Sequence, residues 1–266
     1  MRALMQDKVV LITGGTQGLG LAIAQAAVRE GASGVAIVGR AASKAELAAE
    51  AIRESGREAG VPVEVLPIIA DLSVDGEAER SVADTIAHFG RIDSLVNAAG
   101  ATSRGTLLDT SRELLDEHLT LNLVVPFMTM QGVVADLRGR GAPGTILNII
   151  TMSMHGGQPY LAPYVASKAG LAGLTKNAAF AHRFDRIRIN GLNIGWTATP
   201  GEAVTQQTFH GADDDWLEKA SAEQPMGKLG QPDEIADAVV FLLSERSGVV
   251  TGSIIDWDQN VPGAYE

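Results

Sequence analysis

The sequence predicts an α/β fold in which a doubly wound parallel sheet of about seven strands carries helices on both faces. Short runs rich in Val and Ile alternate with longer Ala- and Leu-rich segments of helical period, such as residues 19–30 and 43–58. The short runs are apolar nearly throughout, which is typical of strands covered on both faces. A strand–helix–strand rhythm implies right-handed crossovers and therefore parallel pairing. The expected strands span residues 9–12, 34–38, 63–69, 92–96, 145–150, 187–192 and 253–255.

The composition excludes several classes of function. The chain has 266 residues, no cysteine, and 21 Lys and Arg against 32 Asp and Glu, which gives a formal charge of −11. Without cysteine there is no disulfide scaffold, thiolate nucleophile or Cys-ligated zinc. The acidic balance disfavours nucleic acids and anionic membranes as partners. No apolar run approaches the roughly 20 residues of a membrane span, and the start lacks a signal peptide, so we expect a cytoplasmic protein.

We expect one domain, residues 1–266, because no linker, internal repeat or charge block divides the chain. The longest poorly patterned segment is residues 199–232, which contains several glycines and the acidic run Asp213-Asp214-Asp215. A long irregular insert in a compact domain is usually a lid or a binding loop. We therefore expect this segment to cover a substrate site.

A glycine-rich segment, residues 13–20, follows the first expected strand and opens the first helix. Gly14, Gly18 and Gly20 would let the backbone turn tightly and approach a phosphate, and the free N–H groups of the helix start favour an anion. A plain strand–helix turn rarely needs all three glycines. The segment lacks the Lys-Ser/Thr pair of a nucleoside triphosphate loop, so the pattern favours a dinucleotide.

Tyr164 and Lys168 lie four residues apart in a predicted helix, so both side chains can face one cleft. A nearby cation favours the phenolate and lowers the pKa of a tyrosine from about 10. A phenol tuned in this way can exchange a proton with an alcohol oxygen at neutral pH. Taken alone, the pair would be interpreted as exposed; together with the glycine-rich segment it indicates chemistry on an alcohol or a carbonyl.

These motifs together resemble the short-chain dehydrogenase/reductase family in its compact single-domain form. The resemblance extends from residue 8 to about residue 252 and includes residues 13–20, 71–72, 97–100, 122, 164–168 and 225–232. It implies a Rossmann-type domain that binds NAD(P) and an oxidoreductase that interconverts a carbonyl and a secondary alcohol by hydride transfer. It also implies a homotetramer or dimer. Two alternatives stay open: the same fold used for dehydration or epimerisation, and a non-catalytic cofactor-sensing protein.

The resemblance implies a role for each catalytic candidate. Tyr164 would be the general acid/base, while Lys168 would tune it and hold the nicotinamide ribose. A hydroxyl upstream of the tyrosine orients the substrate oxygen in the family. The usual spacing points to Thr151, and Ser153 is the rival because alternate residues of an extended chain face the same side.

Asn122 is a polar residue amid apolar neighbours in what is predicted to be one long helix. In the family its backbone carbonyl holds a water that links the catalytic lysine to solvent. Pro126 has no N–H to donate to the carbonyl four residues back, so it would leave the Asn122 carbonyl free for this relay. The alternative is a satisfied core amide.

The end of the second expected strand bears on the choice of cofactor. An acidic residue there would hold the 2′-hydroxyl of NAD, but the position is Gly39 and Arg40 follows, which can pair with the 2′-phosphate of NADP or lie solvated. Gln17 is not the second basic residue that some NADP-specific relatives carry. NADP(H) is favoured, with NAD(H) possible. The resemblance implies these cofactor-binding residues: Gly14, Thr16, Gln17, Gly18, Leu19, Gly20, Arg40, Asp71, Leu72, Asn97, Ala98, Ala99, Gly100, Tyr164, Lys168, Gly195, Thr197 and Thr199.

The substrate is expected to be a small carbonyl or alcohol compound. His155, Tyr160 and Trp196 are candidates for contact with it, because they lie near the catalytic positions in the sequence or can wall an apolar pocket. The five histidines show no HxxxH or HxxE spacing, so we expect no metal site. Trp257 and Asp258 replace glycines that relatives usually carry, which predicts a different backbone path after the last strand.

Overall fold

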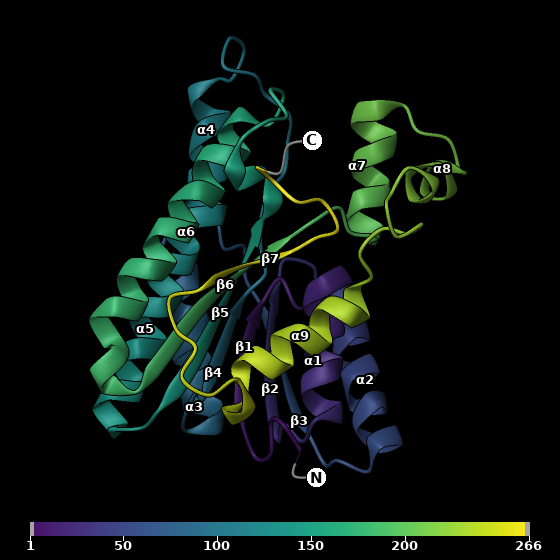
Figure 1. Cartoon of the computed structure of the whole chain (residues 1–266). Helices are drawn as coiled ribbons and strands as arrows, with labels where there is room; N and C mark the ends of the chain where they lie inside the picture. The colour runs from purple at the N-terminus through teal and green to yellow at the C-terminus, as the bar shows by residue number, and fades with distance from the viewer. Residues whose placement is uncertain (1–2, 264–266) are drawn as a thin grey trace.

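A computed structural model describes residues 3–263 and has a seven-stranded parallel sheet at its centre (Figure 1). The strand order is β3-β2-β1-β4-β5-β6-β7, and every neighbouring pair is parallel. The order reverses between β1 and β4, and at such a switch point open α/β sheets bind ligands beyond the carboxyl ends of the strands. The strands are β1 (Val9–Thr13), β2 (Gly34–Gly39), β3 (Glu64–Ile69), β4 (Ser94–Asn97), β5 (Gly144–Thr151), β6 (Ile187–Ile194) and β7 (Ile254–Trp257).

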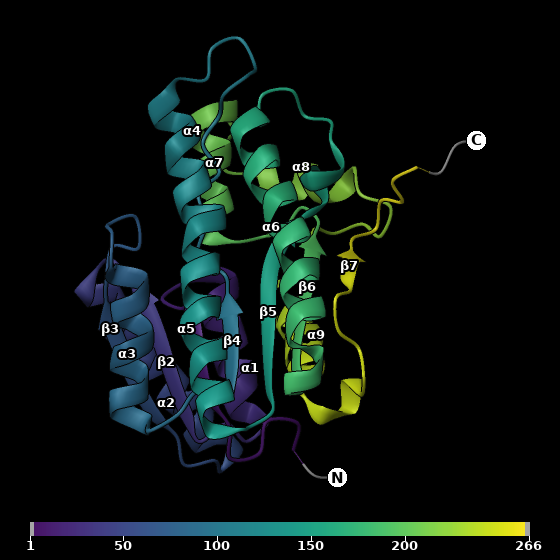
Figure 2. The same ribbon diagram turned by 90° about the vertical axis from the view of Figure 1, so that its left-hand side faces the viewer.

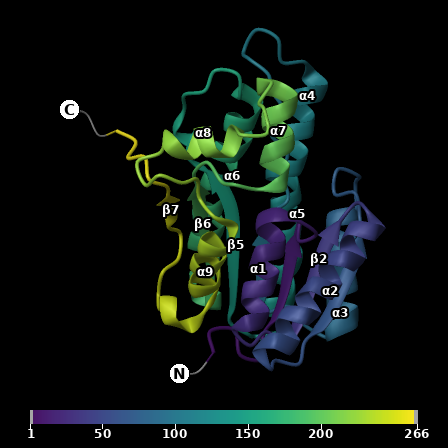
Figure 3. The same ribbon diagram turned by 90° about the vertical axis from the view of Figure 1, so that its right-hand side faces the viewer.

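Helices cover both faces of the sheet, which confirms the predicted doubly wound α/β architecture. Figure 3 shows α1, α2 and α9 on one face, where they bury the larger apolar core. Figure 2 shows α3, α5 and α6 on the other face, over a second core. These helices are α1 (Gly18–Arg29), α2 (Ala42–Ala59), α3 (Glu77–Phe89), α5 (Val125–Arg140), α6 (Ala162–His182) and α9 (Pro232–Leu243).

The segment predicted to be irregular, residues 199–232, contains two helices, so that part of the expectation was wrong. They are α7 (Pro200–His210) and α8 (Trp216–Ala222), which lie beyond the carboxyl edge of the sheet (Figures 1 and 3). The Thr199 hydroxyl caps α7 by accepting a hydrogen bond from the Glu202 amide at 3.0 Å, and Pro200 occupies the first helical position. Gly211 ends the helix in the left-handed region, at φ 59°. These are ordinary start and stop signals of a helix.

The long helix expected around Asn122 is interrupted. Helix α4 (Arg112–Leu119) leads into a π-helical segment, η1 (Thr120–Val124), before α5 begins. Here the Val125 amide donates to the Thr120 carbonyl, five residues back, and Pro126 follows without an N–H. A π-turn within an α-helix is a local insertion that often marks a functional site. It directs Asn122 into the interior, where its side chain is fully buried.

By length and composition, the helical stretch Arg112–Arg140 would be long and apolar enough to cross a membrane, which the sequence analysis did not anticipate. In this structure the stretch is a core helix, because α4 and η1 pack on α6 while α5 packs on α3 and the sheet. Its buried residues include Met130, Val133 and Leu137, which belong to the second apolar core.

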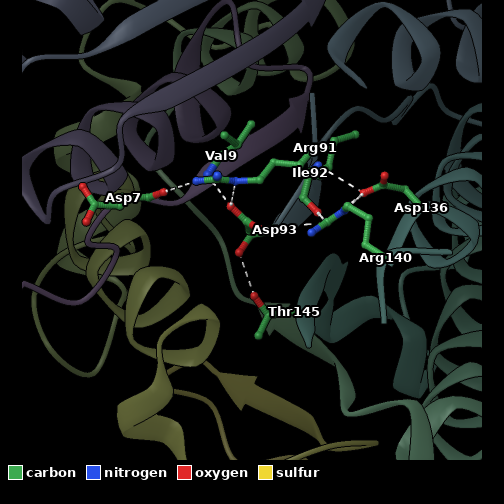
Figure 4. A network of polar contacts seen from close by, with 9 residues as sticks. Asp7, Val9, Arg91, Ile92, Asp93, Asp136, Arg140 and Thr145 are labelled. Atoms are coloured by element: carbon green, nitrogen blue, oxygen red, sulfur yellow. Dashed lines mark hydrogen bonds and ion pairs between the residues drawn. The ribbon is translucent and has the colours of Figure 1, made fainter. Parts of the chain in front are cut away.

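At the amino edge of the sheet, polar residues form a closed network (Figure 4). The Asp93 carboxylate accepts hydrogen bonds from the Val9 amide and from Arg91 Nε, both at 3.0 Å. Arg140 donates to the Ile92 carbonyl at 2.7 Å and pairs with Asp136. The network joins β1, the segment before β4, and α5. It lies at the edge of the sheet opposite to the one that carries the candidate site.

Candidate functional site

A cleft of about 410 Å³ lies at the carboxyl edge of the sheet, where the strand order reverses. It brings together the glycine-rich segment, the ends of β2, β3 and β4, and the start of α6. Most of the predicted cofactor residues line it: Gly14, Thr16, Gln17, Gly18, Leu19, Gly20, Arg40, Asp71, Leu72, Ala98, Ala99, Gly100, Tyr164, Lys168 and Thr199.

The start of α1 is suited to a pyrophosphate. Gly14 and Gly18 adopt left-handed backbone conformations, φ 69° and 54°, which side chains rarely tolerate. Within residues 3–263, Gln17 makes no side-chain capping bond at this helix start and the first turn carries no acidic residue. The first N–H groups of α1 are therefore free to donate to a ligand, and the positive end of the helix dipole faces the cleft. This cradle fits the phosphates of NAD(P).

The rim at the end of β2 carries positive charge. Arg40 is exposed and lines the cleft with Asp71. Hydrogen bonds from the Ser73 hydroxyl and amide hold the pKa of Asp71 below its usual value, and the charge of Arg40 acts in the same direction. The side chain of Thr16 occupies the space that a Cβ at Gly39 would need, so a carboxylate cannot be built there without displacing Thr16.

Tyr164 and Lys168 lie at the inner end of the cleft, on the first turns of α6. The Lys168 amino group is buried, with the residue 5% exposed, and donates to the Ile149 carbonyl at 2.8 Å. Burial lowers the pKa of Lys168 to about 8. Burial also raises the pKa of Tyr164 to about 12, while an interaction with the Thr151 hydroxyl acts in the opposite direction.

Lys168 is not among the groups that shift the pKa of Tyr164, and its tuning role stays a prediction. Desolvation of the phenol outweighs the charges around it, and the cation that lowers the pKa of Tyr164 is Arg104. The Glu202 carboxylate raises that pKa further. At neutral pH the phenol therefore holds its proton.

The two candidate hydroxyls differ in their surroundings. Thr151 is buried, 8% exposed, and its hydroxyl interacts with Tyr164. The Ser153 hydroxyl accepts a hydrogen bond from the Thr151 hydroxyl at 3.3 Å and donates to Gln158 Oε1 at 2.6 Å. The geometry favours Thr151 as the hydroxyl beside the tyrosine.

Asn122 connects η1 to the cleft wall. Its side-chain oxygen accepts from the Ala101 amide at 2.9 Å, and its amide nitrogen donates to the Ala101 carbonyl and the Ser167 hydroxyl, both at 3.0 Å. A Cβ at Gly100 would lie 2.8 Å from the Asn122 side-chain oxygen and 3.6 Å from Lys168 Nζ. Asn122 therefore lies behind the cleft and close to Lys168, and its side chain is also a satisfied core amide.

Several predicted residues do not reach the cleft. Asn97 is turned into the interior, where it donates to Asn148 and accepts from Thr129, both at 2.8 Å. Gly195 and Thr197 line a neighbouring cavity of about 320 Å³ beside Asp258. Asp258 occupies the space that a side chain at Gly195 would need, so the glycine makes room for this charged residue.

The three substrate candidates are divided between the two sides of the site. His155 faces Asp256, with Nε2 3.2 Å from the carboxylate, and lies outside the cleft. Trp196 packs on Trp216, and its Nε1 donates to Glu202, a cleft residue, at 2.8 Å. Tyr160 lies beneath α7, with its ring 5.8 Å from that of His210.

Two charged residues of the site were missed by the sequence analysis. Glu202 lines the cleft from the first turn of α7, and the Thr-x-x-Glu spacing from Thr199 could have placed it there. Arg104 extends from the loop after β4 to the far end of α7. No local pattern marks Arg104, because its aromatic partners and His210 lie more than 50 residues away in the sequence.

Comparison with known proteins identifies the family of this chain. A family model described as enoyl-(acyl carrier protein) reductase matches residues 14–259. A short-chain dehydrogenase/reductase from Cladobotryum sp. is 33% identical over 253 residues, which are 94% of this chain and 94% of that protein. The chain belongs to the short-chain dehydrogenase/reductase family. It is thus an NAD(P)-dependent oxidoreductase of the class that acts on alcohol and carbonyl groups.

Solved structures of this family share the whole fold. The crystal structure of levodione reductase aligns with a TM-score of 0.89 at 30% identity, over 98% of this chain and 100% of that one. L-sorbose reductase from Gluconobacter frateurii, complexed with NADPH and L-sorbose, aligns with a TM-score of 0.90 at 29% identity and covers all of both chains.

Proposed function

We propose that this dehydrogenase/reductase is NADP(H)-dependent and interconverts a carbonyl and a secondary alcohol, with Tyr164 as general acid/base. The observation that carries the proposal is that Tyr164 and Lys168 line the same cleft as the glycine cradle of α1. Bound NADP(H) supplies or accepts the hydride, and the protein supplies orientation and proton transfer. Dehydration or epimerisation and cofactor sensing are not favoured.

In this proposal Tyr164 donates its proton to the carbonyl oxygen during reduction and recovers it during oxidation. The Thr151 hydroxyl, beside Tyr164, orients the substrate oxygen. Lys168, fixed by the Ile149 carbonyl, holds the nicotinamide ribose. Asn122, joined to Ala101 and close to Lys168, maintains a proton path to solvent.

The preference for NADP(H) over NAD(H) is supported by the charge at the end of β2. Arg40 provides a guanidinium at the rim, and the packing of Thr16 against Gly39 leaves no room for the carboxylate that would select NAD. L-sorbose reductase, which was crystallised with NADPH, is consistent with this choice.

We further propose that α7 and α8 form a lid over a small-molecule substrate, with Trp196 and Tyr160 as its walls. A cytoplasmic location and a homo-oligomer, a tetramer or a dimer, complete the proposal. The oligomer is supported by an apolar groove between α5 and α6, which includes Phe127, Leu174 and Ala178.

Replacement of Tyr164 by Phe tests the proposed function. The variant removes the proton donor but keeps the ring, so we expect kcat/KM to fall by about 10²–10⁴-fold while the affinity for NADPH is retained. Absorbance of NADPH with a panel of ketones, polyols, sugars and hydroxy acids gives the rate, and NADPH fluorescence gives the Kd. Unchanged kcat/KM in the variant would contradict the role of Tyr164. Turnover without net change in cofactor absorbance would indicate dehydration or epimerisation.

A further inference from the structure

Arg104 has an unusual environment for an arginine in a loop. Its guanidinium carbon lies 5.5 Å from the centre of the Tyr160 ring and 5.3 Å from that of the Phe209 ring. Nη1 donates to the Thr102 carbonyl at 2.7 Å, and Nη2 lies 3.0 Å from His210 Nε2. Two aromatic rings and two short polar contacts thus hold the guanidinium in one orientation.

The guanidinium nevertheless keeps an unused donor. Nε of Arg104 is buried and has no hydrogen-bond partner among the residues that the structure describes. No carboxylate in residues 3–263 lies within ion-pair distance of Arg104, whereas Arg80, Arg112 and Arg140 each have at least one. A desolvated guanidinium N–H without an acceptor is expensive, so a site of this kind indicates an anionic ligand.

The position of Arg104 places that ligand on the substrate side of the cleft. Thr102, which accepts its hydrogen bond, lines the cleft, and Tyr160 lies in the turn before α6, four residues before Tyr164. The charge of Arg104 also acts on the Tyr164 phenol. Arg40 lies at the other end of the cleft, near Asp71, which follows β3.

We propose that Arg104 binds a carboxylate of the substrate, so that the enzyme acts on hydroxy acids and the corresponding keto acids. The inference rests on the proposed oxidoreductase function and adds the class of substrate. A planar guanidinium donates two parallel hydrogen bonds to a carboxylate, and the contacts with the Tyr160 and Phe209 rings hold the guanidinium in place for that pair. Glu202, on the first turn of α7, would repel a second negative charge, which favours a monocarboxylate over a phosphate ester.

The contact to His210 gives the carboxylate a second effect. Arg104 is the link between the loop after β4 and the end of α7. A ligand held by Arg104 therefore also touches the element that covers the cleft, so binding of the acid and closure of α7 would favour each other.

The test compares acids with neutral compounds of the same carbon skeleton. The pairs are D-gluconate with D-sorbitol and 3-hydroxybutyrate with butan-2-ol, each assayed with NADP⁺ in the full chain. We expect higher kcat/KM for the acid in a pair that is turned over. Arg104→Gln should lower that value by about 100-fold and the value for the neutral partner by less than about threefold, while Arg104→Lys should restore part of the loss.

The neutral partner serves as an internal reference, because any effect of Arg104 on the Tyr164 pKa falls on both compounds alike. Arg183→Gln is the matched control: it removes one positive charge from the end of α6, where Arg183 packs on Phe180 and Phe184, and should change neither ratio. Equal losses for acid and neutral compound in Arg104→Gln, or a wild-type preference for the neutral compound, would overturn the proposal.

Tryptophan fluorescence, from Trp196, Trp216 and Trp257, separates this inference from the function on which it rests. If no compound changes NADPH absorbance, the oxidoreductase proposal fails, but titration of the NADP⁺ complex with each pair still reports binding. Tighter binding of the acids by the wild type than by Arg104→Gln supports the role of Arg104. Acids that bind no more tightly than their neutral partners refute it.

Discussion

The two edges of the sheet differ in whether their polar groups are paired within the protein. At the amino edge, the ends of the strands and the charges around them find partners: Asp93 accepts from the Val9 amide, and Arg140 donates to the Ile92 carbonyl (Figure 4). At the carboxyl edge, the first N–H groups of α1 have no side-chain cap, and Lys168 is buried beside a neutral carbonyl. Arg104 carries a buried donor without an acceptor among the described residues.

This difference separates an edge whose polar groups stabilise the fold from an edge whose polar groups are free to bind a ligand. Satisfied polar groups at the amino edge stabilise the native state, whereas unsatisfied donors and a desolvated cation at the carboxyl edge destabilise it. Proteins commonly give up stability at a functional site, because groups arranged for a ligand are poorly compensated without it. Changes at the two edges should therefore move stability and activity separately.

The largest effect on stability is expected from Lys168. Burial lowers its pKa to about 8 in the folded protein, from 10.5. Below pH 8 both states carry the charge, and folding bears the full cost of burying it. Between about pH 8 and 10.5 the folded state loses its proton first, so the free energy of unfolding rises with pH, by about 3 kcal/mol in total.

Lys168→Met is the variant that isolates this effect. Denaturant unfolding from pH 7 to 10 should show the wild type gaining stability relative to the variant as the pH rises. The quantity to measure is the difference in the free energy of unfolding between the two proteins. Above pH 10 Tyr164 acts with the opposite sign in both of them: the unfolded state loses the phenol proton first, because the pKa is raised in the folded state, and the free energy of unfolding falls as the pH rises. Parallel curves for the two proteins would mean that Lys168 is not desolvated.

The opposite edge should respond in stability alone. Asp93→Ala leaves the Val9 amide and the Arg91 guanidinium without their acceptor, so we expect the free energy of unfolding to fall by about 2 kcal/mol. Arg112→Gln breaks an exposed pair with Asp116 and should leave the free energy of unfolding unchanged within error. Urea unfolding and kcat/KM at the same temperature check both. A loss of kcat/KM in Asp93→Ala without a loss of stability would contradict the separation of the two edges.

The sequence predicted the elements that carry a local signal. The seven strands were found because each contains a short apolar run, and the glycine cradle was found because its glycines follow a strand and precede a helix. Helix α7 carried an equally local signal, Thr199-Pro200 followed by Glu202, and was missed because the glycines around it suggested a loop. The signal for the start of α7 is therefore present in the sequence and was misinterpreted.

The rest depends on pairs of residues that are distant in sequence. The interior role of Asn97 follows from Asn148 and Thr129, which β5 and α5 bring to it. The environment of Arg104 follows from His210, 106 residues away. The pKa of Tyr164 is governed by desolvation, which only the folded arrangement defines. No pattern within one segment contains these facts, so a sequence without an alignment could not supply them.

The smallest effect concerns the exposed end of the carboxyl edge. Arg40 faces solvent beside Asp71, so its attraction for a 2′-phosphate is weaker than that of a buried charge and is screened by salt. We expect Arg40→Ala to raise the Kd of NADP⁺ by about tenfold, or about 1.4 kcal/mol, with little change for NAD⁺. The loss should shrink as NaCl is raised, since screening already weakens the wild-type contact. Titration of both oxidised cofactors at two salt concentrations measures it, and an unchanged Kd for NADP⁺ would remove Arg40 from the choice of cofactor.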